Sequence, residues 1–291
     1  MNTTTFASAA RAIAGAARAA LAWRLLLAWS VLLLLPTIVA ALPMWSFLGA
    51  ALDHSPHAAR LAQALDLMTV TDLAEGARRQ GTALTLALMA SIAITLLLSP
   101  LLSGMAITAA RAPGAAPLGQ LLAGGLRAYP RMGRMLVWGA LLLGLALMLG
   151  DAGSGAAARF GEQAVLAADA DRASVLATLL LALLLMLVQA SLDAGRAQLA
   201  LDSRRSSAIK AWWLGCRLLA RRPLACGGAY LAIGATGLLL AGALALVRIR
   251  LVGADASGFA AAFALTQLVA LVLAWMRCAR LFAFVALART A

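Results

Sequence analysis

Signatures of enzymes and of nucleotide binding are missing from this chain. It has no Walker loop and no dinucleotide fingerprint, and its three cysteines match no metal-binding spacing. No acid, histidine or arginine lies at the centre of its long apolar runs, although a membrane-embedded serine protease would need a buried histidine or lysine there. We therefore expect no enzymatic activity, no cofactor and no bound metal.

Apolar residues are abundant instead. The 291 residues are 64% hydrophobic, with a mean hydropathy of +0.93. A soluble domain is only about half apolar. This chain would therefore expose large apolar patches in water, and a lipid bilayer is the better solvent for it. The net charge is +13, but no basic run sits on a polar domain that could present it, so we expect no nucleic-acid partner.

Six apolar runs have the length of membrane spans, which need about 20 residues each. The predicted fold is an all-α polytopic bundle in which residues 1–291 form one transmembrane domain. The first run is longer than the apolar part of a usual signal peptide, so we expect it to span rather than to be cleaved. The predicted spans are residues 25–46, 83–110, 135–150 (short, and extended by the residues before it), 174–200, 225–247 and 258–286.

Basic and acidic residues alternate along the chain. Seventeen of the 24 basic residues fall before span one, after spans two and four, and at the C-terminus, whereas nine of the 11 acids fall in the other connections. The positive-inside rule then predicts that both termini are cytoplasmic. The excess of arginine, alanine and leucine suggests a bacterial genome, hence the inner membrane. The cysteines lie on or near the cytoplasmic side, where a disulfide is not expected.

The order of parts repeats within the chain. At an offset of 91 residues, Gly104 aligns with Gly195, Gly124 with Gly215 and Arg131 with Arg222. The predicted unit is an amphipathic elbow, a span in and a span out. A third copy would begin with the elbow at residues 5–23, but the pattern leaves two-fold and three-fold repeats open.

The clearest elbow covers residues 206–219. A serine can cap its start, and Ile209, Trp212, Trp213, Cys216 and Leu219 fall near one helical face. Such a helix lies in the membrane interface, where basic side chains bind the anionic head groups of membrane lipids. The alternative is a plain loop packed on the bundle. Pro223 either ends this helix or opens the next one.

The largest external connection covers residues 48–82. Asp53, His54 and His57 lie close together there, but without a fourth ligand an exposed, locally capped turn is the better interpretation. The run Thr69–Asp72 resembles a second helix start.

The best functional candidates lie where spans two, four and six enter the cytoplasm. Asp193 and Arg196 are spaced to pair on one helix face, and Pro100 is expected to kink span two. The candidates could form a charged vestibule or a partner-docking ring. An interfacial ion pair with snorkelling arginines is the simpler explanation, which we favour. The candidates are Ser99, Pro100, Gly104, Gln189, Asp193, Gly195, Arg196 and Arg280.

Two stretches resemble uncharacterised bacterial multi-pass inner-membrane families of unknown function. They are the run Ser99–Gly104 with its following elbow, and the run Asp193–Ser206 together with Leu218–Pro223. The resemblance covers about residues 20–285 and rests on loose motifs. It implies an inner-membrane location and no particular activity.

Two functions fit these observations. The chain could be a non-enzymatic membrane subunit or scaffold of an envelope or transport system, bound to a protein partner. Alternatively it is a permease for a small or lipid-like molecule, with a cavity among spans two, four and six lined by Ser99, Gln189 and Asp193. The scarcity of polar residues in the spans favours the scaffold.

Overall fold

The computed structural model describes most of the chain as helix. The described residues are 3–52, 71, 74–76, 78, 81–112, 114–164, 166–202, 206–251 and 256–290, without the side chains of residues 3–10, 51 and 52. Over these ranges no strand forms. The helices are α1 Thr3–Ala19, α2 Trp23–Leu52, α5 Gly81–Arg111, α6 Leu118–Gln163, α7 Ala167–Leu201, α8 Ala208–Arg221, α9 Pro223–Arg250 and α10 Ala256–Arg289.

Six of these helices are long and apolar enough to cross a membrane: α2, α5, α6, α7, α9 and α10. Each contains one of the six predicted spans, so the predicted multi-pass helical fold is confirmed. The short third span belongs to α6, which has 46 residues and a length of about 69 Å at 1.5 Å per residue. This helix extends beyond the prediction on both sides, and it absorbs the elbow that precedes the span.

The other elbows are separate helices. Ser207 caps α8, because its side chain accepts a hydrogen bond from the backbone N–H of Lys210 at 3.4 Å. Arg222 ends α8, and Pro223 opens α9 as its first residue, where a missing N–H costs nothing. The elbow prediction for residues 206–219 is therefore confirmed as a helix, and Pro223 takes the second of its two predicted roles.

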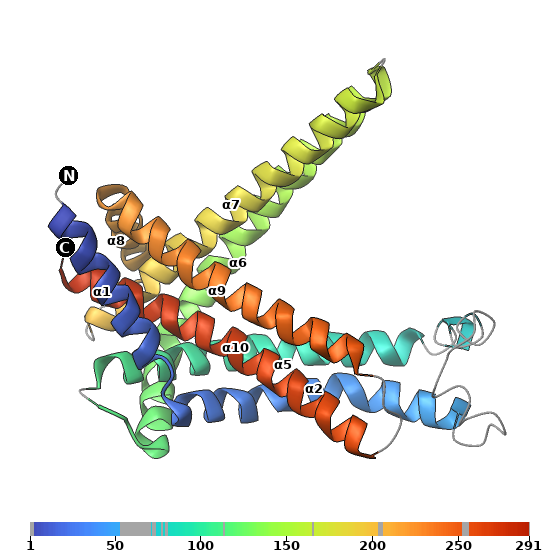
Figure 1. The fold of residues 1–291 in the computed structure, drawn as a ribbon, viewed down its shortest axis with the longest axis horizontal. Helices are drawn as coiled ribbons and strands as arrows, with labels where there is room; N and C mark the ends of the chain where they lie inside the picture. Colours follow the sequence, from blue (N-terminus) through green and yellow to red (C-terminus); the bar gives the residue numbers. More distant parts are fainter. Residues whose placement is uncertain are drawn as a thin grey trace.

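The six long helices form three antiparallel pairs that meet at one end of the molecule (Figure 1). We call this end the base; α1, α8 and both chain termini lie there. The pairs α2/α5 and α9/α10 run away from the base together, whereas α6/α7 leaves it at a steep angle. The buried core draws on the basal parts of all helices.

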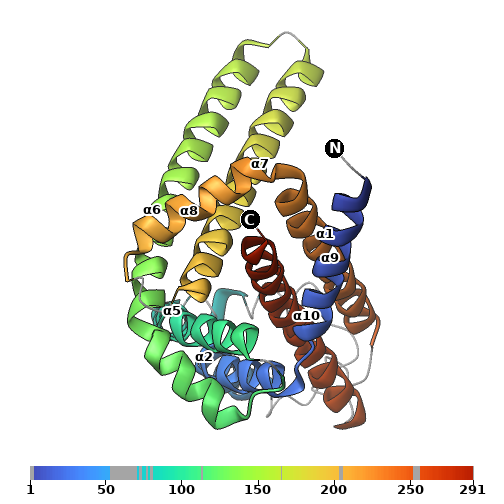
Figure 2. The ribbon, with the colours of Figure 1, turned by 90° about the vertical axis from the view of Figure 1, so that its left-hand side faces the viewer.

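The basal half of α10 lies at the centre of this core. Viewed onto the base, its C-terminal end is surrounded by the other helices (Figure 2). A helix that is apolar on all sides is expected to be buried on all sides. Ten of its residues are buried: Ala274, Met276, Cys278, Ala279, Leu281, Phe282, Ala283, Phe284, Val285 and Leu287.

Glycines allow the helices at the base to approach closely. A Cβ at Gly104 would lie 2.8 Å from the backbone oxygen of Gly125 in α6, and a Cβ at Gly215 in α8 would lie 2.5 Å from the backbone nitrogen of Gly195 in α7. In lipid no hydrophobic driving force brings helices together, so association depends on close van der Waals packing. Small residues at the crossing allow the two backbones to make that contact. Gly104 and Gly195, which the repeat alignment pairs, thus both lie at tight crossings, while the repeat itself stays a prediction.

Arginines at the base satisfy carbonyl groups at helix C-termini. Arg111 donates to the carbonyls of Leu199 and Ala200 at the end of α7, and Arg289 donates to the carbonyl of Ala110 in α5 at 3.3 Å. Arg222 donates to the Thr290 carbonyl at 2.6 Å. These last-turn carbonyls have no intrahelical partner and carry the negative end of the helix dipole. Part of the basic charge therefore has a structural role.

The elbow α8 divides its apolar residues between the bundle and the outside. Trp212 donates to Ser191 at 2.9 Å and contacts Trp138 edge to face, with ring centroids 5.5 Å apart. Ile209 and Trp213 point away from the core and are each 55% exposed. The helix thus packs on α7 through its small residues, and the two large side chains of Ile209 and Trp213 stay exposed on its outer face.

The crossing of α7 and α8 generates a stability prediction. Changing Gly215→Ala forces two backbones apart, so we expect it to destabilise the detergent-solubilised protein by about 1–3 kcal/mol. The control is Gly227→Ala in α9, where nothing lies within 4 Å of the new Cβ and alanine improves helix propensity. Thermal melting should fall for the first variant only; equal melting temperatures would contradict the close crossing.

Candidate functional site

The three helix pairs enclose a cavity of about 370 Å³ close to the base, within the size range of ligand sites. Its walls come from α2, α5, α6, α7, α9 and α10. Polar side chains gather on it from four of them. They are Thr95, Ser99 and Ser103 from α5, Gln189, Asp193 and Arg196 from α7, Tyr230 from α9, and Arg277 and Arg280 from α10.

Helical spacing explains why these residues share one surface. Thr95, Ser99 and Ser103 are each four residues apart, so one face of α5 presents three hydroxyl groups in successive turns. Asp193 and Arg196 follow Gln189 by four and seven residues and fall on one face of α7 for the same reason. One polar face of α5 and one of α7 therefore line the cavity.

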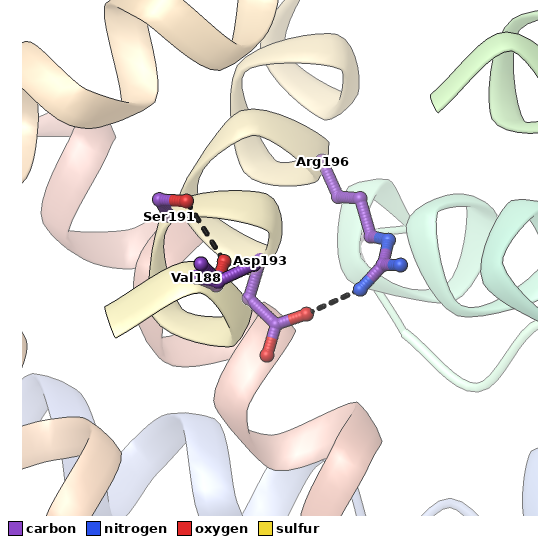
Figure 3. A network of polar contacts seen from close by, with 4 residues as sticks. All are labelled: Val188, Ser191, Asp193 and Arg196. Carbon is purple, nitrogen blue, oxygen red and sulfur yellow. Dashed lines mark hydrogen bonds and ion pairs between the residues drawn. The ribbon is translucent and has the colours of Figure 1, made fainter. Parts of the chain in front are cut away.

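Asp193 and Arg196 form an ion pair, with 2.6 Å between the Oδ1 and Nη1 atoms. Their side chains are only 16% and 22% exposed. Both project from the same side of α7, whereas Ser191 projects from the other and donates to the Val188 carbonyl (Figure 3). The pairing predicted from the sequence is thus present, and it is much less exposed than a surface pair.

Arg280 is held by contacts other than an ion pair. Its guanidinium carbon lies 4.2 Å from the centroid of the Tyr230 ring, a cation–π contact. Its Nη2 lies 3.4 Å from the Met276 sulfur, a weak acceptor. A Cβ at Gly234 would lie 2.6 Å from that nitrogen, so only glycine leaves this space open. The site therefore positions the guanidinium against α9.

Two buried donors on the cavity wall lack acceptors within the part of the chain that the structure describes. They are Nε of Arg280 and Nε1 of Trp29. Ser30 and Trp138, which do not line this cavity, have the same property. A buried donor without an acceptor costs about 1–3 kcal/mol. Two residues of the cavity wall therefore carry buried donors that the described part of the chain leaves unsatisfied.

The charge of the cavity is positive. Three arginines and one carboxylate line it, and the carboxylate is already paired with Arg196. In a partly buried setting these charges are screened less than on an open surface. The arrangement therefore favours an electron-rich ligand over a cation.

Five of the eight candidates from the sequence lie together on the cavity wall: Ser99, Gln189, Asp193, Arg196 and Arg280. The cavity also lies among spans two, four and six, where the permease hypothesis expects one. Pro100, Gly104 and Gly195 are buried at helix contacts instead and do not line it. The helix α5 continues through Pro100, and the Tyr129 hydroxyl donates to the Leu97 carbonyl in the preceding turn at 3.0 Å.

Sequence reasoning missed two aromatic residues of the site, Trp29 and Tyr230. Each lies about two turns inside the basal end of a helix that runs away from the base, α2 and α9 respectively. A search for aromatic residues at matching depth in the predicted repeat units would have found them.

The three residues that the sequence analysis considered as metal ligands, Asp53, His54 and His57, lie outside the described residues. Across the part of the chain that is described, no group of three or more metal-ligating side chains comes together.

Comparison with models of protein families, with curated proteins and with solved structures finds no match. The resemblance to uncharacterised bacterial membrane families stays a prediction, and the geometry of the cavity has to carry the functional argument.

Two ion pairs on α7 with the same spacing give a matched test of the site. Removing one charge by Asp193→Asn leaves Arg196 partly buried without its carboxylate, so we expect a loss of about 1–3 kcal/mol in stability. The pair Asp169–Arg172 is 42% and 77% exposed, and Asp169→Asn should cost well under about 1 kcal/mol. Thermal melting in detergent measures both, and equal losses would contradict the difference in burial.

Proposed function

We propose that this multi-pass protein is a non-enzymatic permease of a bacterial inner membrane that moves a small or lipid-like molecule through the central cavity. The observation that supports the proposal is the convergence of polar side chains from three helix pairs on one cavity. Polar groups at membrane depth are costly and usually serve a function. The scarcity of such groups in the sequence favours a scaffold, whereas the meeting of nine of them on one cavity supports transport.

The shape of the fold supports the same proposal. The cavity lies where the pairs diverge, so relative movement of α6/α7 against the other two pairs would change access to it. Leu136, Ala140 and Leu143 continue its wall along one face of α6 with apolar side chains. A ligand with an apolar part could use this wall.

A scaffold remains the second proposal, supported by the outer halves of the helix pairs. Large apolar side chains are exposed there, such as Met148 on α6 at 74% and Leu239 on α9 at 73%. Lipid can cover such faces, and so can a protein partner in a membrane complex. A protein that co-purifies in stoichiometric amount from native membranes in mild detergent would favour this second role.

The orientation proposed for the protein places the base in the cytoplasm. The basic segments lie at this end, where the positive-inside rule expects them. Arg24 lies over the Trp23 ring at 5.5 Å, and Arg217 over the Trp213 ring at 5.9 Å. Paired tryptophan and arginine suit the interfacial depth of a bilayer, where they contact anionic head groups.

Cysteine labelling tests this orientation without introducing new residues. Cys226 and Cys278 are buried, which leaves Cys216 on α8 as the accessible thiol. A membrane-impermeant maleimide should label inside-out vesicles and not intact spheroplasts, with Cys216→Ser as the control. Burial raises the pKa of the Cys216 thiol, so the thiolate fraction is small at neutral pH and labelling should accelerate as the pH rises from 7 to 9. Labelling of intact spheroplasts would instead show that the base faces the outside of the cell membrane.

Transport can be measured in proteoliposomes with three probes: fluorescent phosphatidylglycerol, fluorescent phosphatidylcholine and entrapped carboxyfluorescein. We expect the protein to move at least one of them. The change Ala140→Trp places a large ring in the cavity and should reduce the transport rate by at least about tenfold. This reduction corresponds to an activation free energy higher by about 1.4 kcal/mol. Leu141→Trp adds the same ring at the neighbouring position, which is 62% exposed and off the cavity, and should leave the rate unchanged.

The two tryptophan variants decide the outcome. Equal rates for both variants and the unchanged protein would show that any movement bypasses the cavity. No movement of any probe by a protein that melts cooperatively would count against a permease for these molecule classes and favour the scaffold.

A further inference from the structure

We infer that the cavity binds the oxyanion head group of a membrane amphiphile, with Arg277 and Arg280 as its principal contacts and the apolar chain along the α6 wall. The inference rests on the proposed function, because it names the ligand class of the same cavity. It adds a chemical requirement, an anionic phosphate or carboxylate joined to a hydrocarbon chain.

The unsatisfied groups of the site, among the described residues, favour a ligand with negative charge. Both buried groups without partners on the wall, Arg280 Nε and Trp29 Nε1, are donors. A guanidinium and an indole N–H cannot accept a hydrogen bond, so the complementary ligand must supply acceptors. Oxyanions supply several lone pairs at once, and hydrogen bonds to them from charged donors are shorter and stronger than neutral ones.

The charges already present leave two arginines for this ligand. Asp193 is paired with Arg196 at 2.6 Å. Neither Arg277 nor Arg280 forms a salt bridge with a carboxylate in the described part of the chain. Two guanidinium groups on successive turns of one helix, facing one cavity, match the several oxygens of a phosphate better than a single point charge.

Arg280 is oriented before any ligand binds. The Tyr230 ring covers one side of its guanidinium group, and the open space at Gly234 receives Nη2. These two contacts hold the guanidinium group in one position on the cavity wall. Such preorganisation lowers the entropy cost of binding.

The apolar wall distinguishes an amphiphile from a free anion. Leu33, Leu102, Leu136 and Leu143 line the same cavity as the arginines. A small hydrated anion would gain nothing from these side chains and would lose water beside them. The acyl chain of a membrane amphiphile can lie along these side chains without exposing apolar surface to water, because they are as apolar as lipid.

Binding measurements on the purified full-length protein in dodecyl maltoside, by native mass spectrometry, test this inference. The probes are phosphatidylglycerol, phosphatidylcholine and diacylglycerol with identical acyl chains, together with soluble glycerol phosphate. We expect phosphatidylglycerol to bind at least about tenfold more tightly than diacylglycerol, which lacks the phosphate, the gain of one charge-assisted contact. Phosphatidylcholine carries the same phosphate beside a choline cation and should bind with intermediate affinity. Glycerol phosphate alone should bind weakly.

Substitutions locate the binding to the cavity. Arg277→Gln and Arg280→Lys should each reduce the preference for phosphatidylglycerol over diacylglycerol by about tenfold while leaving the binding of diacylglycerol unchanged. The controls Arg217→Gln on the elbow and Arg250→Gln at the far end of α9 each remove one positive charge outside the cavity and should preserve the preference. Arg280→Lys keeps the charge and the fold, and Arg277 is exposed, so loss of folding does not confuse the result.

Three results would overturn the inference. They are equal binding of phosphatidylglycerol and diacylglycerol, loss of the preference in Arg217→Gln but not in the cavity variants, and binding of glycerol phosphate as tight as that of the lipid. The last result would identify a free anion as the ligand. Because these measurements involve no transport, a protein that binds the lipid selectively but moves none would refute the permease and leave the inference intact.

Discussion

Burial of the basal half of α10 is the constraint on which the rest of the structure depends. Its residues from Ala274 to Leu287 contribute the largest continuous part of the core, and α9, α1, α7, α2 and α5 all pack against it. Small residues such as Ala279 and Ala283 let these helices approach closely. Because the shared core ends near the base, the outer parts of the three pairs are free to diverge.

The divergence creates the cavity and also determines its chemistry. Where α6/α7 separates from the other pairs, the groups on their inner faces lose protein neighbours, and several polar residues of the spans line the cavity there. One carboxylate is satisfied by Arg196, whereas the donors of Arg280 and Trp29 find no acceptor among the described residues. A buried donor that no protein group satisfies is tolerated at a functional site when a ligand can complete it.

The basic residues at the base serve more than one purpose. Arg111, Arg222 and Arg289 stabilise the C-terminal turns of α7, α10 and α5. Arg217 lies over an exposed tryptophan on the elbow, and Arg280 lies inside the molecule. A charge count along the sequence treats these residues alike, although one group caps helices, another suits the membrane interface and a third lines a cavity.

The amino-acid sequence by itself determined the six spans, the elbow helix with its Ser207 cap and the Asp193–Arg196 pair, because each depends on residues that are neighbours along one helix. It also indicated most of the polar candidates, since such residues are few in apolar spans. Only the tertiary structure decided that α10 is central, that Gly104 and Gly195 are packing positions, and that Trp29 and Tyr230 belong to the site. The physical reason is that a span in lipid is apolar on both its inner and outer faces. Apart from the short polar rows on α5 and α7, the sequence of a span therefore does not show which face meets a neighbouring helix, and that face is determined only by the packing of all six helices.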